Sequence, residues 1–419
     1  MQKGDTANLP KGWEIKKLGE ICEIKGRIGY RGYTTNDLVN KGEGAITLSP
    51  SNIQNNKFNT NECTYISWFK YEESPEIMVF EGDILFVKTG STYGKVALVE
   101  NLLEKATINP QFVVLKNIKC LNKFLYYSLT TIEFKAKVEK IIGGAATPTL
   151  SQTNLAKQTI PVPPLHEQQQ IVSTLDECFT AIDKAKANTE QNLKNAKDLF
   201  ESYLQGVFEN ENWGKIKLSN ITSDITDGDH LPPPKSKEGF PFITISNINK
   251  TTYKIDFSDT FKVSQSYYDN LKQNRKPIKG DVLYTVTGSY GIPVLIEDDY
   301  PFCFQRHIGL IRPGNKLNSK LLFYWILSPQ AISQANETAI GTAQKTVSLK
   351  SLRNFDFPNI PLVEQQTIVH QLDALRTETQ KLEAVYQKKI ANLDELKKSI
   401  LQKAFMGKLS ATMECISYS

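Results

Sequence analysis

Two polar segments in the first half of the chain carry residue types that could contact nucleic acid. Residues 26–33 read Gly-Arg-Ile-Gly-Tyr-Arg-Gly-Tyr, and residues 88–95 read Lys-Thr-Gly-Ser-Thr-Tyr-Gly-Lys. Glycine lets a backbone approach a phosphate, arginine can donate two hydrogen bonds to guanine, and tyrosine can stack or bind phosphate. The alternative for each segment is an ordinary solvated loop beside a strand.

The second half of the chain offers comparable segments. Asp227-Gly228-Asp229-His230 precedes two lysines, the Thr-Gly-Ser sequence of residues 89–91 recurs at residues 287–289, and an Arg-His pair lies at residues 306–307. The candidate DNA contacts are Arg27, Tyr30, Arg31, Tyr33, Lys88, Thr89, Ser91, Tyr93, Lys95, Asp229, His230, Lys235, Lys237, Thr287, Ser289, Tyr290, Arg306 and His307.

Catalytic motifs are missing from the sequence. The four histidines are isolated, no Cys/His cluster has zinc spacing, and no glycine-rich nucleotide-binding loop is present. Residues 109–112 read Asn-Pro-Gln-Phe, close to the tetrad of amino-methyltransferases, but Gln replaces the second Pro and residues 305–308 read Gln-Arg-His-Ile. We therefore expect no active site, no metal site and no cofactor in this chain.

Length and composition limit the class of protein. A chain of 419 residues with 40% hydrophobic residues is expected to form two or more globular domains. The formal net charge of +5 permits a nucleic-acid partner without requiring one. No apolar run approaches the ~20 residues that span a bilayer, and six cysteines without a CxxC pair favour reduced thiols and a cytoplasmic location.

The sequence is a tandem repeat. Pro161, Pro164 and Leu165 followed by Glu-Gln-Gln recur at Pro358, Pro361 and Leu362, so the offset is 197 residues (361 − 164 = 197). Each repeat is a body of about 150 residues followed by a tail of about 45, and the tails match best. Residues 21–45 and 221–242 hardly align, which is the pattern of a shared framework with divergent loops.

Both tails are predicted to be long helices. Apolar residues at heptad spacing form one stripe on each, and proline and glutamate are favourable in a first helical turn. Some 40 residues correspond to a helix of about 60 Å. Two such helices most simply pack on each other, and a plain helical hairpin inside one core is the alternative. The helix-start and seam residues are Pro164, Glu167, Gln168, Ile171, Leu175, Ile182, Pro361, Glu364, Gln365, Ile368, Leu372, Leu382 and Leu393.

The two bodies are predicted to be mixed α/β. Short apolar or β-branched runs bounded by Gly, Asn and Pro indicate strands. The predicted strands are residues 45–48, 84–87, 96–99, 112–115, 242–245, 282–286, 293–296 and 308–311, and the predicted helices are residues 123–129 and 320–327.

Several motifs together resemble a known family. The Gly-Asp-Ile-Leu and Gly-Asp-Val-Leu strands with their Thr-Gly-Ser turns, the IPVPPLHEQQQIV and FPNIPLVEQQTIV helix starts, and the closing LKKSILQKAFMGKL are similar to type I restriction-modification specificity subunits. The resemblance runs from Trp13 to about Leu409. It implies two target-recognition domains that each read half of an asymmetric, interrupted DNA sequence, and two long helices packed as an antiparallel coiled coil.

The resemblance also implies partners. The helices would act as a spacer and dock two methyltransferase subunits, and two translocase-nuclease subunits could join. S-adenosylmethionine, ATP and magnesium would belong to those partners. The predicted divisions are residues 11–162 and 211–359 for the recognition domains, 163–210 and 360–410 for the spacer helices, and 411–419 for a tail.

Two other functions remain open at this stage. The chain could serve a methylation complex without a nuclease, or it could be a coiled-coil scaffold that binds only proteins. A scaffold has no reason to repeat basic, tyrosine-containing turns on its globular bodies, so DNA reading is favoured. Two readers on one face of B-DNA must lie about one turn apart, ~34 Å, or a multiple of it, and a rigid spacer would set that distance.

Exchange of residues 213–358 for the corresponding domain of a similar protein is expected to change recognition of one half-site only. Methylation mapping in cells that contain the partner methyltransferase would measure both half-sites. Altered recognition at both ends would contradict the modular interpretation.

Overall fold

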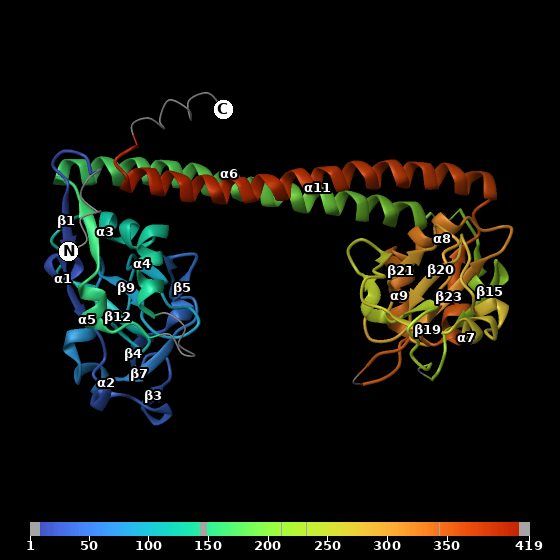
Figure 1. Cartoon of the computed structure of the whole chain (residues 1–419), viewed down its shortest axis with the longest axis horizontal. Coiled ribbons are helices and arrows are strands. Elements are labelled where there is room, and N and C mark those ends of the chain that lie inside the picture. Colours follow the sequence, from blue (N-terminus) through green and yellow to red (C-terminus); the bar gives the residue numbers. More distant parts are fainter. Residues whose placement is uncertain (1–8, 143–148, 211, 232, 343, 410–419) are drawn as a thin grey trace. The chain divides into compact units, whose positions relative to one another are not determined.

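The computed structural model describes residues 9–142, 149–210, 212–231, 233–342 and 344–409, except the side chain of Tyr30. The predicted tail at residues 411–419 lies outside this part. The chain divides into two compact units, Met1–Asn188 with Lys389–Ser419 and Thr189–Lys388. Each unit contains one mixed α/β body and part of each of two long helices, α6 (Leu165–Phe208) and α11 (Leu362–Phe405) (Figure 1).

The first body is built on two sheets. One has the order β10-β9-β12-β2 and is antiparallel. The other has the order β3-β7-β4-β11-β8, in which β4 and β11 are parallel. The strands are β1 (Glu14–Lys17), β2 (Glu23–Lys25), β3 (Leu38–Val39), β4 (Gly44–Leu48), β5 (Ile53–Gln54), β6 (Lys57–Phe58), β7 (Thr64–Ser67), β8 (Met78–Val79), β9 (Ile84–Val87), β10 (Val96–Leu98), β11 (Ala106–Ile108), β12 (Phe112–Lys116) and β13 (Thr159–Val162). The helices are α1 (Leu18–Ile21), α2 (Trp68–Glu72), α3 (Asn122–Leu129), α4 (Ile132–Ile142) and α5 (Gln152–Ala156).

Alternation along the strands explains this layering. On β9, Ile84 and Phe86 pack in a cluster with residues of α3 and α4. Leu85 and Val87 point the other way and pack against the second sheet. Successive side chains of a strand face opposite sides, so an uninterrupted apolar run is buried on both.

The second body repeats this plan in a smaller form. Its main sheet has the order β15-β23-β20-β21, and a second sheet has the order β19-β16-β22. The strands are β14 (Lys215–Lys217), β15 (Thr222–Asp227), β16 (Phe240–Ile243), β17 (Ile248–Asn249), β18 (Lys254–Ile255), β19 (Phe261–Val263), β20 (Val282–Thr285), β21 (Pro293–Leu295), β22 (Cys303–Phe304), β23 (Ile308–Pro313) and β24 (Asp356–Pro358). The helices are α7 (Gln265–Asp269), α8 (Ser319–Ile326), α9 (Pro329–Thr338) and α10 (Leu349–Arg353).

The predicted fold class is confirmed. All eight predicted strands and both predicted body helices are present, with ends that differ by a few residues. The largest difference is at residues 242–245, where β16 ends at Ile243. Asn247 accepts a hydrogen bond from the Thr244 N–H through its side chain and turns the chain into a 3-10 helix, Ile245–Asn247. Pro164 and Pro361 precede the helices, and their carbonyls accept the first helical hydrogen bonds.

In each unit, the hydrogen bonds of one glutamine attach the first turn of a long helix to the α/β body. Gln168 Oε1 accepts from the Leu121 N–H at 2.9 Å, and its Nε2 donates to the Pro163 carbonyl at 2.9 Å. Gln365 makes the same bonds with the Asn318 N–H at 2.7 Å and the Ile360 carbonyl at 2.8 Å. Both glutamines are buried, and each holds its helix against the turn that starts α3 or α8.

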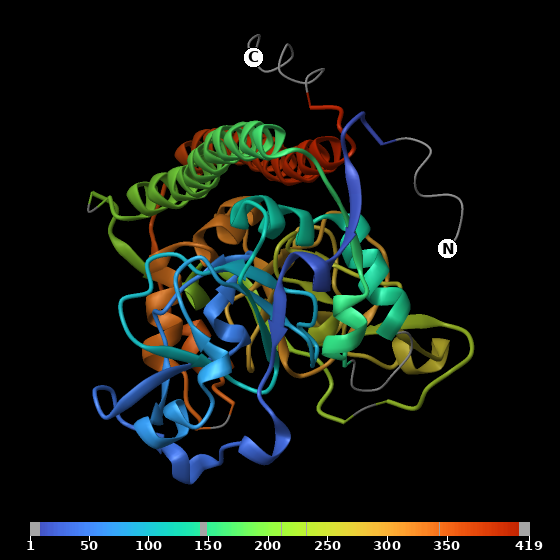
Figure 2. The same ribbon diagram turned by 90° about the vertical axis from the view of Figure 1, so that its left-hand side faces the viewer.

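Two turns further along, an aspartate repeats the attachment. Asp176 accepts from the Tyr127 hydroxyl at 2.5 Å and pairs with Lys123 at 2.8 Å. Asp373 accepts from Tyr324 at 2.7 Å and pairs with Lys320 at 2.8 Å. Burial and the bond to the carboxylate raise the pKa of both tyrosine hydroxyls. In the first unit, α3 accordingly lies between the main sheet and α6 (Figures 1 and 2).

The two long helices pack antiparallel within each unit. In the first unit, Ile171, Leu175 and Ile182 of α6 share a cluster with Ile400 and Ala404 of α11. In the second unit, Leu204 and Phe208 share a cluster with Ile368 and Leu372. The start of one helix thus meets the end of the other in both units, which confirms the antiparallel pairing.

Polar contacts flank this seam. Lys186 pairs with Asp394 at 2.7 Å and Lys397 with Asp183 at 2.7 Å. Burial raises the pKa of Asp183, but hydrogen bonds from Lys397 and Lys57 outweigh it and leave that pKa lowered. Leu382, which the sequence placed in the seam, is 41% exposed and lies at its edge.

Tyr127→Phe and Tyr324→Phe are each expected to lower the free energy of unfolding by about 1.5–3 kcal/mol, because each removes a hydrogen bond to a charged acceptor. Urea unfolding measures this. Tyr203→Phe is the matched control, since its exposed hydroxyl bonds only the neutral Gln371 side chain, and it should cost well under ~1 kcal/mol. Equal losses in all three variants would contradict the attachment.

Candidate nucleic-acid interface

The main sheet of the first body brings two candidate segments to one edge. β2 and β9 both pair antiparallel with β12, so β2 and β9 run in the same direction. Their carboxyl ends, Lys25 and Val87, therefore lie beside the start of β12. The segments at residues 26–33 and 88–95 leave the sheet at this edge. The opposite edge contains the start of β9, where the Gly82 carbonyl accepts a hydrogen bond from Asn122 of α3.

The second body arranges its candidates in the same way. Asp227 at the end of β15 pairs with Gly309, and Thr285 at the end of β20 pairs with Ile308, at the start of β23. Three segments consequently meet at this edge, namely residues 227–230, 286–292 and 305–307. The sequence predicted these segments separately, and the sheet topology places them together.

The paired Thr-Gly-Ser turns have the same construction. Gly90 and Gly288 adopt positive φ values of 98° and 71°, which favour glycine. Thr89 bridges to Thr149, and Thr287 bridges to Thr346, so a later strand-like segment supports each turn. Ser91 and Ser289 are exposed at the tips, and Ser289 accepts a hydrogen bond from Lys250 at 2.8 Å.

The cations around the first turn differ in exposure. Lys88 is partly buried, and this burial lowers the pKa of its ammonium group. Thr89, Tyr93 and Lys95 are half-buried. Ser91 therefore presents the most accessible polar group of this turn.

Arg27 has a different place from the one expected of a base contact. Only 6% of it is exposed, and its guanidinium donates to the Ile108 carbonyl at 3.2 Å and to Thr107 Oγ1 at 3.3 Å. It also lies over the Tyr33 ring at 5.2 Å, and burial lowers the pKa of the guanidinium. The structure thus uses Arg27 to hold its loop. Arg31 pairs with Glu76 at 3.4 Å, and Tyr33 is half-buried.

Asp229 likewise has internal partners. Its carboxylate accepts from the Tyr267 hydroxyl and pairs with Arg275 at 3.3 Å. His230, Lys235, Lys237 and Arg306 are exposed, and His307 is half-buried. The sequence missed Arg275 and Tyr267 because they lie 46 and 38 residues from Asp229, and nothing local in the sequence marks their contact.

The Gly-Asp motif before each turn has a structural role. Asp281 is 1% exposed, forms a two-bond pair with Arg312 at 2.7 and 2.9 Å, and accepts from the Ile278 N–H at 2.9 Å. Asp83 makes one such bond with Lys116, at 2.5 Å, and accepts from the Phe80 N–H at 2.9 Å. These pairs fix the start of β20 and β9, and so the strand that leads to each turn.

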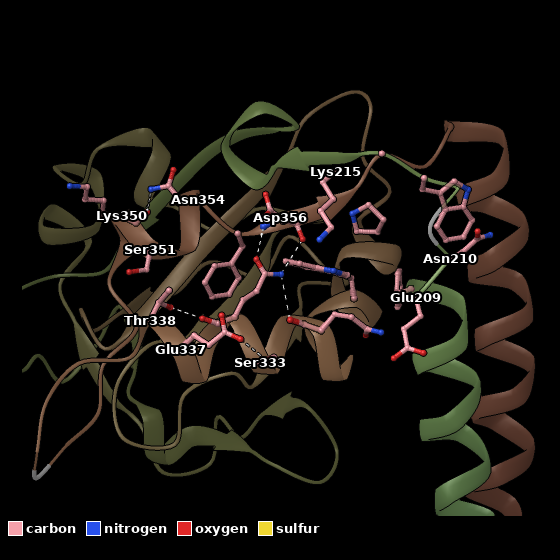
Figure 3. Close-up of a pocket in the computed structure, with 18 residues that line it drawn as sticks. Glu209, Asn210, Lys215, Ser333, Glu337, Thr338, Lys350, Ser351, Asn354 and Asp356 are labelled. Atoms are coloured by element: carbon pink, nitrogen blue, oxygen red, sulfur yellow. Dashed lines mark hydrogen bonds between the residues drawn. The ribbon is translucent and has the colours of Figure 1, made fainter.

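A separate depression of about 990 Å³ lies in the second unit between α9, α10, β24 and the chain after α6 (Figure 3). Its polar groups partly satisfy one another, since Ser333 bonds Glu337 at 2.8 Å and Thr338 bonds the Gln334 carbonyl at 2.7 Å. The candidate DNA contacts in the described part of the chain do not line it. It belongs to the junction of the second body with α6.

The part of the chain that the structure describes contains no group of three or more His, Cys, Asp or Glu that could hold a metal ion. Within the same residues, no helix is both long and apolar enough to cross a membrane.

Two tandem mixed α/β bodies joined to antiparallel long helices define a fold class found in solved structures. A chain from a structure on complex assembly and conformational transition of the type I R-M system superposes with a TM-score of 0.76 at 22% identity, covering 96% of this chain and 99% of that one. The HsdS subunit from Thermoanaerobacter tengcongensis superposes with a TM-score of 0.60 at 21% identity, covering 98% and 100%.

The family follows from the sequence comparison. The model of the type I restriction modification DNA specificity domain matches residues 10–195 and 210–392, and the chain belongs to this family. The EcoKI specificity subunit of Escherichia coli K12 is 24% identical over 97% of this chain and 91% of its own length. A putative MjaX specificity subunit of Methanocaldococcus jannaschii is 24% identical over 97% and 96%. The EcoBI specificity subunit of Escherichia coli is 25% identical over 69% and 66%.

Asp281→Ala is expected to lower the free energy of unfolding of the second unit by about 3–5 kcal/mol, because it leaves the Arg312 guanidinium without its buried partner. Thermal unfolding measures the loss. Asp256→Ala is the control, since Asp256 is exposed and its carboxylate bonds only Ser258. A similar loss in both variants would contradict the role assigned to Asp281.

Proposed function

We propose that this chain is the specificity subunit of a type I restriction-modification complex and reads an asymmetric, two-part sequence in double-stranded DNA. Each body reads one half. The observation that carries this proposal is that each main sheet gathers polar loops at one edge, on the same framework but with different residues. A shared framework with different loops fits two different half-sites.

The long helices complete the proposal. They would hold the two readers at a set separation and dock two methyltransferase subunits, to which translocase-nuclease subunits could be added. Exposed apolar side chains on α6 and α11, such as Leu199, Leu382 and Val385, would suit a helical partner. The chain itself would be non-catalytic and cytoplasmic, and S-adenosylmethionine, ATP and magnesium would be bound by the partners.

Methylation mapping tests the proposal in cells that produce this chain with its methyltransferase partner. We expect a two-part, asymmetric motif that disappears when this chain is deleted. A complex that methylates DNA and never cleaves it would indicate the methylation-only alternative. Unchanged methylation on deletion, with the partner active, would favour the protein-only scaffold.

Two double variants test whether the sheet edge of the second body contacts DNA. Replacing Ser289 and Tyr290 by Ala should weaken methylation through the second half-site, because both lie in the turn after β20. Replacing Ser333 and Thr338 by Ala is the matched control, since both line the depression at the α6 junction. Equal effects of the two pairs would contradict the assignment of the interface to the sheet edge.

A further inference from the structure

The loop after β15 is held by a compact ionic cluster. Arg275 donates to Asp227 at 3.1 Å and to Asp229 at 3.3 Å, and Tyr267 donates to the other oxygen of Asp229. The side chains of both aspartates are 18% exposed and that of Arg275 is 27% exposed. One guanidinium therefore joins both carboxylates of the loop, in a largely buried setting where such bonds are strong.

The same loop forms backbone hydrogen bonds with the segment that contains the exposed Arg306. The Asp229 N–H donates to the Phe304 carbonyl at 3.0 Å, and the Arg306 N–H donates to the Asp229 carbonyl at 3.0 Å. Between the aspartates, a Cβ on Gly228 would lie 1.9 Å from the Phe304 carbonyl oxygen, so the two segments touch with no room for a side chain. The position of Arg306 consequently depends on the position of Asp229.

The first body has an ion pair at the corresponding place, but its charges are reversed. There the loop contributes Arg31, and the acid is Glu76 on the 3-10 helix Pro75–Ile77. In the second body the loop contributes the acids, and the base is Arg275 on the 3-10 helix Gln273–Arg275. Both 3-10 helices end five residues before the glycine of the Gly-Asp motif, Gly82 in the first body (82 − 77 = 5) and Gly280 in the second (280 − 275 = 5). In a framework contact the acid and the base would occupy the same elements in both bodies, as they do in the pairs of Asp83 and Asp281. In this ion pair the acid and the base change places, and the loop sequences differ as well.

We propose that Arg275 is a positioning residue for DNA recognition by the second body, acting through Asp227 and Asp229 to hold Arg306 at the sheet edge. The inference rests on the proposed function. Arg306 is the group that reaches the DNA, and Arg275 stays within the protein. The loop and its 3-10 helix form one recognition element, in which the acids and the base must match.

Methylation mapping of the complete complex tests this with Arg275→Gln. The expected result is a rise of about 10-fold in methylation at sites mismatched in the second half, the scale of one well-placed base contact. The first half-site, read by the other body, should be unaffected and serves as an internal control. Lys272→Gln, which removes a neighbouring exposed charge, should leave both half-sites unchanged.

Further variants guard against simple unfolding. Tyr267→Phe removes only the hydroxyl that donates to Asp229. It should relax the second half-site in the same direction, with a loss of stability no larger than that of Tyr324→Phe, which also removes one hydrogen bond to a carboxylate. Arg275→Lys keeps the charge but cannot bridge two carboxylates as well, so it should restore discrimination only in part.

The outcomes separate the two hypotheses. Unchanged discrimination in Arg275→Gln, or equal relaxation of both half-sites with a lowered melting temperature, would overturn the positioning role. Absence of any two-part motif with the wild-type chain would instead refute the proposed function. Relaxation confined to the second half-site supports both.

Discussion

The hydrogen bonds of Gln168 and Gln365 are the interactions on which the rest of this structure depends. Each amide satisfies a backbone N–H of the body and a carbonyl before the helix, so a body and its helix share one set of buried bonds. Asp176 and Asp373 add a second point of attachment. With two fixed points along a helix face, a body cannot rotate about the helix without breaking buried polar contacts.

This constraint carries through the sheet to its far edge. The strands β9 and β20 begin beside the attachment, at buried pairs of Asp83 and Asp281, and end at the Thr-Gly-Ser turns. The two bodies are therefore alike where they contact the long helices and differ in the loops that face solvent. Buried charges need defined partners, whereas exposed loops can vary at little cost. The same chain can thus keep one architecture and present two different surfaces.

The sequence predicted most of the framework because the signals there are local and periodic. The run Ile84–Val87 and the heptads around Leu175 and Leu372 are short-range patterns, and the structure agrees with them. Individual contacts at the site were harder to predict. Arg27 looked like a base contact, but its donors are used by carbonyl and hydroxyl groups about 80 residues away. Asp229 pairs with Arg275, which lies 46 residues further along the chain, and no spacing rule predicts such a partner.

The ion pair of Lys186 and Asp394 has a consequence for what each helix can bind. The 197-residue offset relates Lys186 to Glu383 and Asp394 to Lys197. Two copies of α6 in the same antiparallel register would set Lys186 against Lys197, and two copies of α11 would set Glu383 against Asp394. Like charges in those positions repel. The charges at this position therefore favour pairing of α6 with α11 over self-pairing of either helix.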